Sequence, residues 1–86
     1  MPRFFIDSDD GELHVDDNEG LDLKDAVAAR VVAIALLPEM ARQKLSDSDL
    51  RTFNVRVRDE QGEMIYTADL ILRGEWKVPA EMRQAS

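Results

Sequence analysis

Alternating apolar and polar residues near the start of the chain predict a β-hairpin. A short apolar run at Phe4–Ile6 is stopped by the polar stretch 7–11. Leu13 and Val15 then alternate with polar neighbours, which is typical of a half-buried strand. A second polar turn at 17–20 ends this strand.

A second alternating pattern predicts another hairpin in the later half of the chain. Phe53, Val55 and Val57 are separated by polar residues, and the turn 59–62 follows with its glycine placed for a left-handed backbone. A last strand is expected at about Glu63–Arg73. Four of its residues share one face: Tyr66, Ala68, Leu70 and Leu72.

Between the hairpins, a three- and four-residue apolar repeat predicts a long helix from about Lys24 to Leu45, with Asp25 in its first turn. The stripe expected to face the sheet is Val27, Val31, Ile34, Ala41 and Leu45. Pro38 interrupts the repeat, because proline has no N–H for the carbonyl four residues earlier. Two outcomes stay open: a kinked helix, or one helix ending near Leu37 and another starting at Pro38.

The element order β-β-α-β-β predicts an α+β fold, in which an antiparallel sheet of two hairpins is covered on one face by one long helix. A single domain is expected at 1–76, followed by a flexible tail at 77–86. The strand order in the sheet is left open. The sheet side of the core is expected from Phe4 and Ile6 or Phe5, with Leu13, Val15, Phe53, Val55, Val57, Tyr66, Leu70 and Leu72.

The helix carries more apolar residues than one face can hold. At 100° per residue, Val32 and Leu36 lie far round the helix from the stripe assigned to the sheet. Together with neighbours on the same side they form a second stripe, which is expected outside the core and is the candidate interface: Ala29, Val32, Leu36 and Met40. Contiguous exposed apolar residues often mark a protein-interaction surface.

Charge narrows the classes of partner. The first 25 residues hold nine acids and two bases, and so carry the whole net charge of −7. Such an acidic lobe repels phosphate backbones and anionic lipid, which disfavours nucleic acid and membranes as partners. The chain has no cysteine, no secretory h-region and no membrane-length apolar run, so a cytoplasmic location is expected.

Candidate chemistry is sparse. The acidic tip from Asp7 to Glu12 lacks the spacing of an EF-hand loop, so it is interpreted as a solvated turn rather than a calcium site. His14, the single histidine, is expected on a solvent-facing strand position without catalytic partners. Arg51, Arg56 and Arg58 are interpreted as a solvated face, opposite to Phe53. No nucleotide, hydrolase or zinc motif is present, and we expect no enzyme activity, cofactor or metal.

Several short motifs, in this order, carry a resemblance: Met1-Pro2-Arg3-Phe4-Phe5, Asp7, Asp10-Gly11, Asp17, Glu19-Gly20, Ala28-Ala29-Arg30, Val57-Arg58-Asp59 and Gly62. Over about residues 1–72 the chain resembles a domain-of-unknown-function family of short, uncharacterised alphaproteobacterial proteins that open M-P-R-[FY]-F. The resemblance implies a bacterial, cytosolic β-β-α-β-β unit, and it implies no activity, ligand or catalytic residue.

These features favour a non-catalytic protein-interaction module, either a homodimer or an adaptor for another protein, that uses the second helical stripe or an exposed strand edge. The alternative is a ligand- or cation-binding regulatory domain that uses the acidic N-terminal hairpin.

Overall fold

The computed structural model describes residues 1–44 and 48–84. It contains one long helix, five strands and one short 3-10 turn. Their bounds are β1 (Arg3–Asp9), β2 (His14–Val15), β3 (Leu21–Asp22), α1 (Ala26–Lys44), β4 (Leu50–Arg58), β5 (Met64–Arg73) and η2 (Ala80–Met82). Leu45, expected at the end of the helix, lies outside the described residues, as do Ser46 and Asp47.

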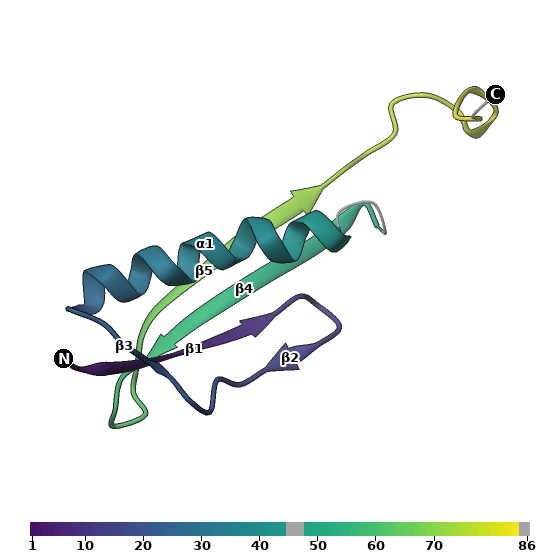
Figure 1. Cartoon of the computed structure of the whole chain (residues 1–86). Coiled ribbons are helices and arrows are strands. Elements are labelled where there is room, and N and C mark those ends of the chain that lie inside the picture. The colour runs from purple at the N-terminus through teal and green to yellow at the C-terminus, as the bar shows by residue number, and fades with distance from the viewer. Residues whose placement is uncertain (45–47, 85–86) are drawn as a thin grey trace.

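The strands form one antiparallel sheet in the order β2-β1-β4-β5, and β3 pairs with the other end of β1. The two expected hairpins are therefore β1–β2 and β4–β5, and they meet along β1 and β4, where Ile6 lies opposite Val57. The helix lies across one face of this sheet (Figure 1). The predicted α+β fold is confirmed, with β3 as an added short strand.

Helix α1 begins at a side-chain cap and runs without a break to Lys44. The Asp25 carboxylate accepts a hydrogen bond from the N–H of Ala28 at 2.9 Å, as an N-cap residue does. Pro38 lies inside the helix and is exposed, so of the two outcomes left open the one with two separate helices is excluded. On the solvent side, water can reach the Ile34 carbonyl that proline leaves without a helical donor.

The core lies between α1 and the inner strands. Its sheet side comes from alternate residues of β1 and β4, namely Phe4, Ile6, Phe53, Val55 and Val57. Three residues expected in the core are exposed instead: Leu13, Val15 and Leu70. Leu13 and Val15 lie just before and in β2, and Leu70 lies in β5. β2 and β5 are the outer strands of the sheet, on either side of the central strands β1 and β4.

The helix presents a different face to the sheet from the one expected. Its buried residues recur every four positions: Ala29, Ala33, Leu37 and Ala41. Val27 is 69 % and Val31 is 58 % exposed, so their assignment to the core is wrong. The buried line runs between the two stripes that the sequence indicated, because three small alanine side chains let the helix backbone approach the sheet closely.

Beyond β5 the chain leaves the body of the domain. Residues 74–79 continue away from the sheet as an extended segment that leads to η2 (Figure 1). Trp76 is 54 % exposed along this segment. The domain boundary expected near residue 76 stays a prediction.

Candidate functional site

The tip of the β1–β2 hairpin is shaped by carboxylates that bind backbone N–H groups. Asp10 accepts hydrogen bonds from the N–H of Leu13 at 2.8 Å and of Glu12 at 2.9 Å, and Asp9 accepts one from Gly11 at 2.8 Å. The N–H donors of Leu13 and Glu12 hold the pKa of the Asp10 carboxyl below its ordinary value. These acids therefore have a structural task at the turn.

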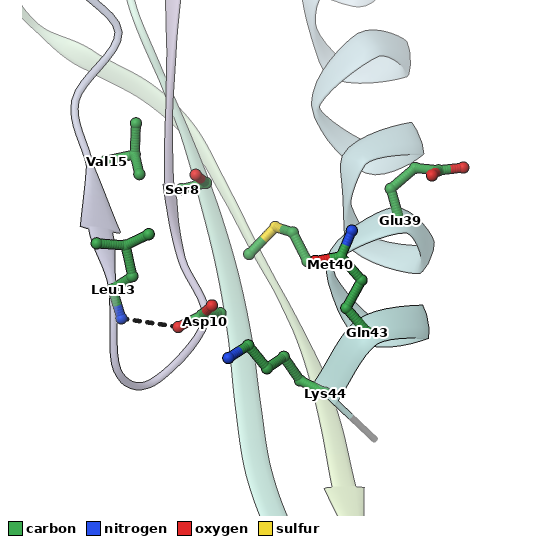
Figure 2. A pocket seen from close by; sticks show the side chains of 8 residues that line it. All are labelled: Ser8, Asp10, Leu13, Val15, Glu39, Met40, Gln43 and Lys44. Atoms are coloured by element: carbon green, nitrogen blue, oxygen red, sulfur yellow. Dashed lines mark hydrogen bonds between the residues drawn. The ribbon is translucent and has the colours of Figure 1, made fainter. Parts of the chain in front are cut away.

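A groove lies between this hairpin and the last turns of α1. It has a volume of about 240 Å³. Its walls come from β1, β2 and the helix, and its lining residues are Ser8, Asp10, Leu13, Val15, Glu39, Met40, Gln43 and Lys44. In Figure 2, Leu13 and Val15 stand on the hairpin, and the Met40 side chain extends from the helix toward them.

The apolar part of the groove consists of three side chains that are only partly covered. Leu13 is 62 % and Val15 is 47 % exposed, although both belong to the hairpin. Met40 packs against the core with part of its surface and lines the groove with the rest. The flexible thioether of methionine adapts to differently shaped apolar partners.

Charged side chains surround this apolar part. Lys44 reaches the Glu12 carboxylate at 3.9 Å, which ties the helix end to the hairpin tip. Glu39 and Arg42 form an exposed ion pair one helical turn apart at 3.1 Å. Exposed pairs of this kind contribute under about 1 kcal/mol each, so a binding partner can rearrange them at little cost.

Arg51 on β4 binds residues at the tip of the β1–β2 hairpin. It is buried, its Nε donates to the Asp10 carbonyl at 2.9 Å, and it approaches the Glu12 carboxylate at 3.2 Å. Its guanidinium lies 5.9 Å from the centre of the Phe53 ring. The expectation that Arg51 and Phe53 lie on opposite faces is therefore wrong, because residues two apart in a strand share a face.

The other two arginines do lie on the open face of the sheet, where Arg58 forms a paired network. It donates to both oxygens of the buried Asp7 carboxylate, at 2.7 and 2.9 Å, and to the Asp17 carbonyl at 2.9 Å. The Asp17 N–H in turn donates to Asp7 at 2.9 Å. Asp7 lies in strand β1 and is buried, so its assignment to the solvated turn is wrong.

The same network sets the charge of its carboxylates. Burial by itself raises the pKa of Asp7, but the hydrogen bonds from Arg58 and from the Asp17 N–H outweigh it, so the pKa of Asp7 lies below the ordinary 3.8. The same two effects act on Asp17. Burial raises its pKa, but the hydrogen bonds from the N–H groups of Gly20 and Ile6 lower it more, so the pKa of Asp17 also lies below its ordinary value. Both groups are ionised at neutral pH.

His14 is half-exposed on the open face, as its alternation predicts. Its Nε2 lies 2.7 Å from an Asp16 oxygen, and Nη2 of Arg56 lies 3.1 Å from its Nδ1. Arg56 also donates to the Asn54 side-chain oxygen at 3.0 Å. This ladder of paired polar groups gives the uncovered side of the sheet a solvated surface.

The candidate interface stripe is divided by the structure. Ala29 is fully buried, and Val32, Leu36 and Met40 pack against the core as partly buried residues. The expectation that the stripe lies outside the core is wrong, because the helix is rotated so that the stripe forms one flank of the buried line. Of the four residues, Met40 is the one that lines the groove.

Sequence reasoning did not assign Leu13 and Val15 to the surface. The period-2 alternation that predicts their strand is present, but it gives no strand order, and both were expected in the core. The available signal was the shortness of the segment and its acidic neighbours, which are typical of an edge strand. For the cation alternative, residues 1–44 and 48–84 contain no group of three acidic or histidine side chains able to hold a metal ion.

Fold and groove together define a small α+β domain with a helix on one face of an antiparallel sheet and an exposed apolar groove at one sheet edge. The chain belongs to a domain-of-unknown-function family, DUF6894, whose model matches residues 3–71. No curated protein matches the chain, and no solved structure matches it. In the part of the chain that the structure describes, no helix has the length and apolarity of a membrane span.

Proposed function

We propose that the protein is a non-catalytic protein-interaction module, and that the groove between α1 and the β1–β2 hairpin binds an apolar, basic segment of a partner protein. One observation carries the proposal: Leu13, Val15 and Met40 converge on a groove that is open to solvent. When an apolar side chain of a partner fills such a groove, apolar surface on both proteins is removed from water, and this burial favours binding.

The size of the groove supports a side chain as its occupant. Pockets for cofactors and drug-sized ligands have volumes of roughly 300 to 1,000 Å³ and are lined mainly by apolar groups. The groove, at about 240 Å³, is smaller, and five of its eight lining residues are polar. It suits one or two apolar side chains of a peptide segment, with main-chain groups left at the polar rim.

Charge supports a basic partner. At the groove itself the carboxylates of Glu12 and Glu39 are each paired with a cation, Lys44 and Arg42, so the excess of negative charge comes from the rest of the chain. The net charge of the chain is −7. Complementary charge raises the rate of encounter and suppresses binding of acidic partners, while the apolar groove supplies affinity. For the same reason, nucleic acid and anionic membranes are not proposed as partners, and the proposed site of action is the cytoplasm.

Hydrogen bonding supports a role without catalysis. The carboxylates of the hairpin with lowered pKa bind backbone N–H groups or Arg58, and His14 is flanked by Asp16 and Arg56. A general base needs access to a substrate proton at hydrogen-bond distance. Groups occupied in this way stabilise the fold around the groove.

A peptide with alternating leucine and lysine residues tests the proposal. A fluorescent twelve-residue peptide of this kind is titrated with the full chain, and saturable binding in the micromolar range is expected by fluorescence anisotropy, weakened by added salt. Two control peptides replace all leucines by serine or all lysines by glutamate, and both are expected to bind at least about tenfold more weakly.

A matched pair of protein variants locates the site. Leu13→Ser removes an apolar side chain from the groove, and Val27→Ser removes one that is 69 % exposed at the other end of the helix. Leu13→Ser is expected to weaken binding several-fold and Val27→Ser to leave it unchanged. Equal affinities of both variants, or no saturable binding by the wild-type chain, would contradict the proposal.

A further inference from the structure

The edge of the sheet opposite the groove is formed by β5, a ten-residue strand. Among the described residues, no strand lies on its outer side. Proteins usually protect such edges with lysine, proline, a bulge or a covering element. Between Met64 and Leu72, β5 has no proline or lysine, and its one charged residue is Asp69. A register shift opposite Val57 and Arg58 leaves Ile65 as an extra residue near the start of β5, and the regular edge that follows it, from Tyr66 to Arg73, is a template for pairing with another strand.

The pairing with β4 shows which backbone groups point outward. The N–H of Gly74 donates to the Asp49 carbonyl at 2.6 Å, and the Ala68 carbonyl accepts a bond from the Asn54 side chain on β4 at 3.2 Å. Even-numbered residues therefore direct their N–H and C=O groups toward β4. Because the direction alternates along a strand, Thr67, Asp69, Ile71 and Arg73 direct theirs to the open edge.

The segment 66–76 also carries large apolar side chains that are exposed in the single chain. Ile71 and Trp76 are each 54 % exposed, and Leu70 is 40 % exposed. Residues 74–76 extend past the last bond to Asp49, away from the rest of the domain (Figure 1). A partner strand along this segment would cover these side chains and satisfy the outward backbone groups together.

We infer that two copies of the chain pair antiparallel along β5, with Ile71 of each copy at the two-fold axis. This register places Asp69 opposite Arg73 of the partner copy, twice. An axis at Asp69 would oppose two carboxylates, and an axis at Leu72 would place Asp69 opposite Glu75. Among these three axes charge complementarity favours Ile71, since opposite charges across strands stabilise and like charges destabilise.

The same register sorts the remaining pairs by face. On the side of the sheet that the helix covers, Leu70 meets Leu72 and Tyr66 meets Trp76, so apolar residues face apolar residues. On the open side, Thr67 meets Glu75 and the Asp69–Arg73 pairs flank Ile71. Within β5, the outward groups of Asp69, Ile71 and Arg73 of each chain pair with one another in this register and would form about six main-chain hydrogen bonds.

The dimer joins two sheets into one continuous antiparallel sheet with a helix on each copy. Because the strand order places β2 and β5 at opposite edges, the two grooves stay accessible at the outer ends. Such a dimer offers two binding sites to a partner with repeated segments, which raises overall avidity without any new contact at either groove. The inference rests on β5 and is independent of what the groove binds.

Sedimentation velocity of the full chain over a range of concentrations tests the inference. The wild type is expected to sediment as a concentration-dependent dimer. Ile71→Lys places two ammonium groups at the axis and is expected to raise the dissociation constant at least about tenfold. Ile65→Lys is the matched control, because it makes the same change on the same strand outside the paired segment 66–76.

A charge exchange tests the register itself. Asp69→Lys and Arg73→Asp are each expected to weaken the dimer, and the double variant Asp69→Lys/Arg73→Asp is expected to recover most of the wild-type affinity. Circular dichroism checks that each variant folds, and the rescue keeps the test decisive if one single variant is unstable. A wild type that stays monomeric at high micromolar concentration, or a double variant weaker than both single ones, would overturn the inference.

Discussion

Arg58→Met is expected to lower the free energy of unfolding by roughly 2 to 4 kcal/mol. Breaking one partner of a buried ion pair costs about 3 to 5 kcal/mol because the other charge is left without compensation. The side chain of Asp7 is 6 % exposed, whereas that of Arg58 is 31 % exposed, so water reaches one side of the pair and the loss is smaller. After the change, Asp7 retains the N–H of Asp17 as a donor.

This loss is large for a domain of this size. At roughly 0.05 to 0.15 kcal/mol per residue, 86 residues give a total stability of about 4 to 13 kcal/mol. Methionine keeps the aliphatic stem of the side chain, but it also removes the guanidinium that lies 5.2 Å from the centre of the Phe5 ring. The expected loss therefore includes this cation–π contact, and comparison with Asp7→Asn and the double variant separates it from the charge pair.

Urea denaturation of wild type, Asp7→Asn, Arg58→Met and the double variant measures the coupling. Since the two side chains act as a unit, the double variant is expected to lose at least about 1 kcal/mol less than the sum of the single variants. Additive losses, or a loss below about 1 kcal/mol for Arg58→Met, would refute the role of the pair in stability.

The pH dependence gives a second measure of the same pair. The folded pKa of Asp7 is lowered, so its stabilisation is fully present above the ordinary value of 3.8 and is lost as the pH falls through the folded pKa. The wild type is therefore expected to lose stability below about pH 4. Arg58→Met should lose less over this range, with a remainder from Asp10 and Asp17, whose pKa values are also lowered.

Two further predictions concern backbone conformation and packing. Gly20 and Gly62 both have positive φ, and alanine costs roughly 1 to 2 kcal/mol at such a position, but a Cβ at Gly20 would also lie 2.9 Å from the Phe4 carbonyl oxygen, with open space at Gly62. Thermal unfolding is therefore expected to show a larger fall in melting temperature for Gly20→Ala than for Gly62→Ala, and equal falls would contradict the close approach. Ala33→Leu is expected to cost roughly 1 to 3 kcal/mol by overpacking, while Val31→Leu on the exposed side should change stability by under about 0.5 kcal/mol. If Ala33→Leu does not lower the stability, the buried alanine residues of α1 are not close-packed against the sheet.

The strands were predictable from the sequence because their periodicity is local. Alternation at 53–57 and the glycine at 62 determine β4 and the turn after it, and Gly62 has the expected positive φ of 82°. The phase of α1 was not predictable in the same way. Apolar residues occupy almost every side of the helix, so the pattern does not select one face. Two of the four buried positions, Ala33 and Leu37, belong to neither of the stripes that the sequence indicated.

The site depends on contacts that no local pattern encodes. Arg51 is buried because its charge meets Glu12 and its Nε meets the Asp10 carbonyl, about 40 residues earlier in the chain. Leu13 and Val15 alternate as a core strand does, yet they are exposed because their strand lies at the sheet edge. Strand order decides both outcomes, and it follows from tertiary pairing rather than from sequence period.

Methyl spectra of the four methionines test the interaction function most directly. The chain has four methionines, of which Met40 lines the groove, while Met64 begins β5 and Met82 lies in η2. In a ¹³C-methyl-methionine sample held at one protein concentration, the leucine–lysine peptide is expected to shift the Met40 signal saturably, with Leu13→Ser reducing the shift. Equal shifts at all four methionines, or a saturable shift that spares Met40, would contradict binding in the groove.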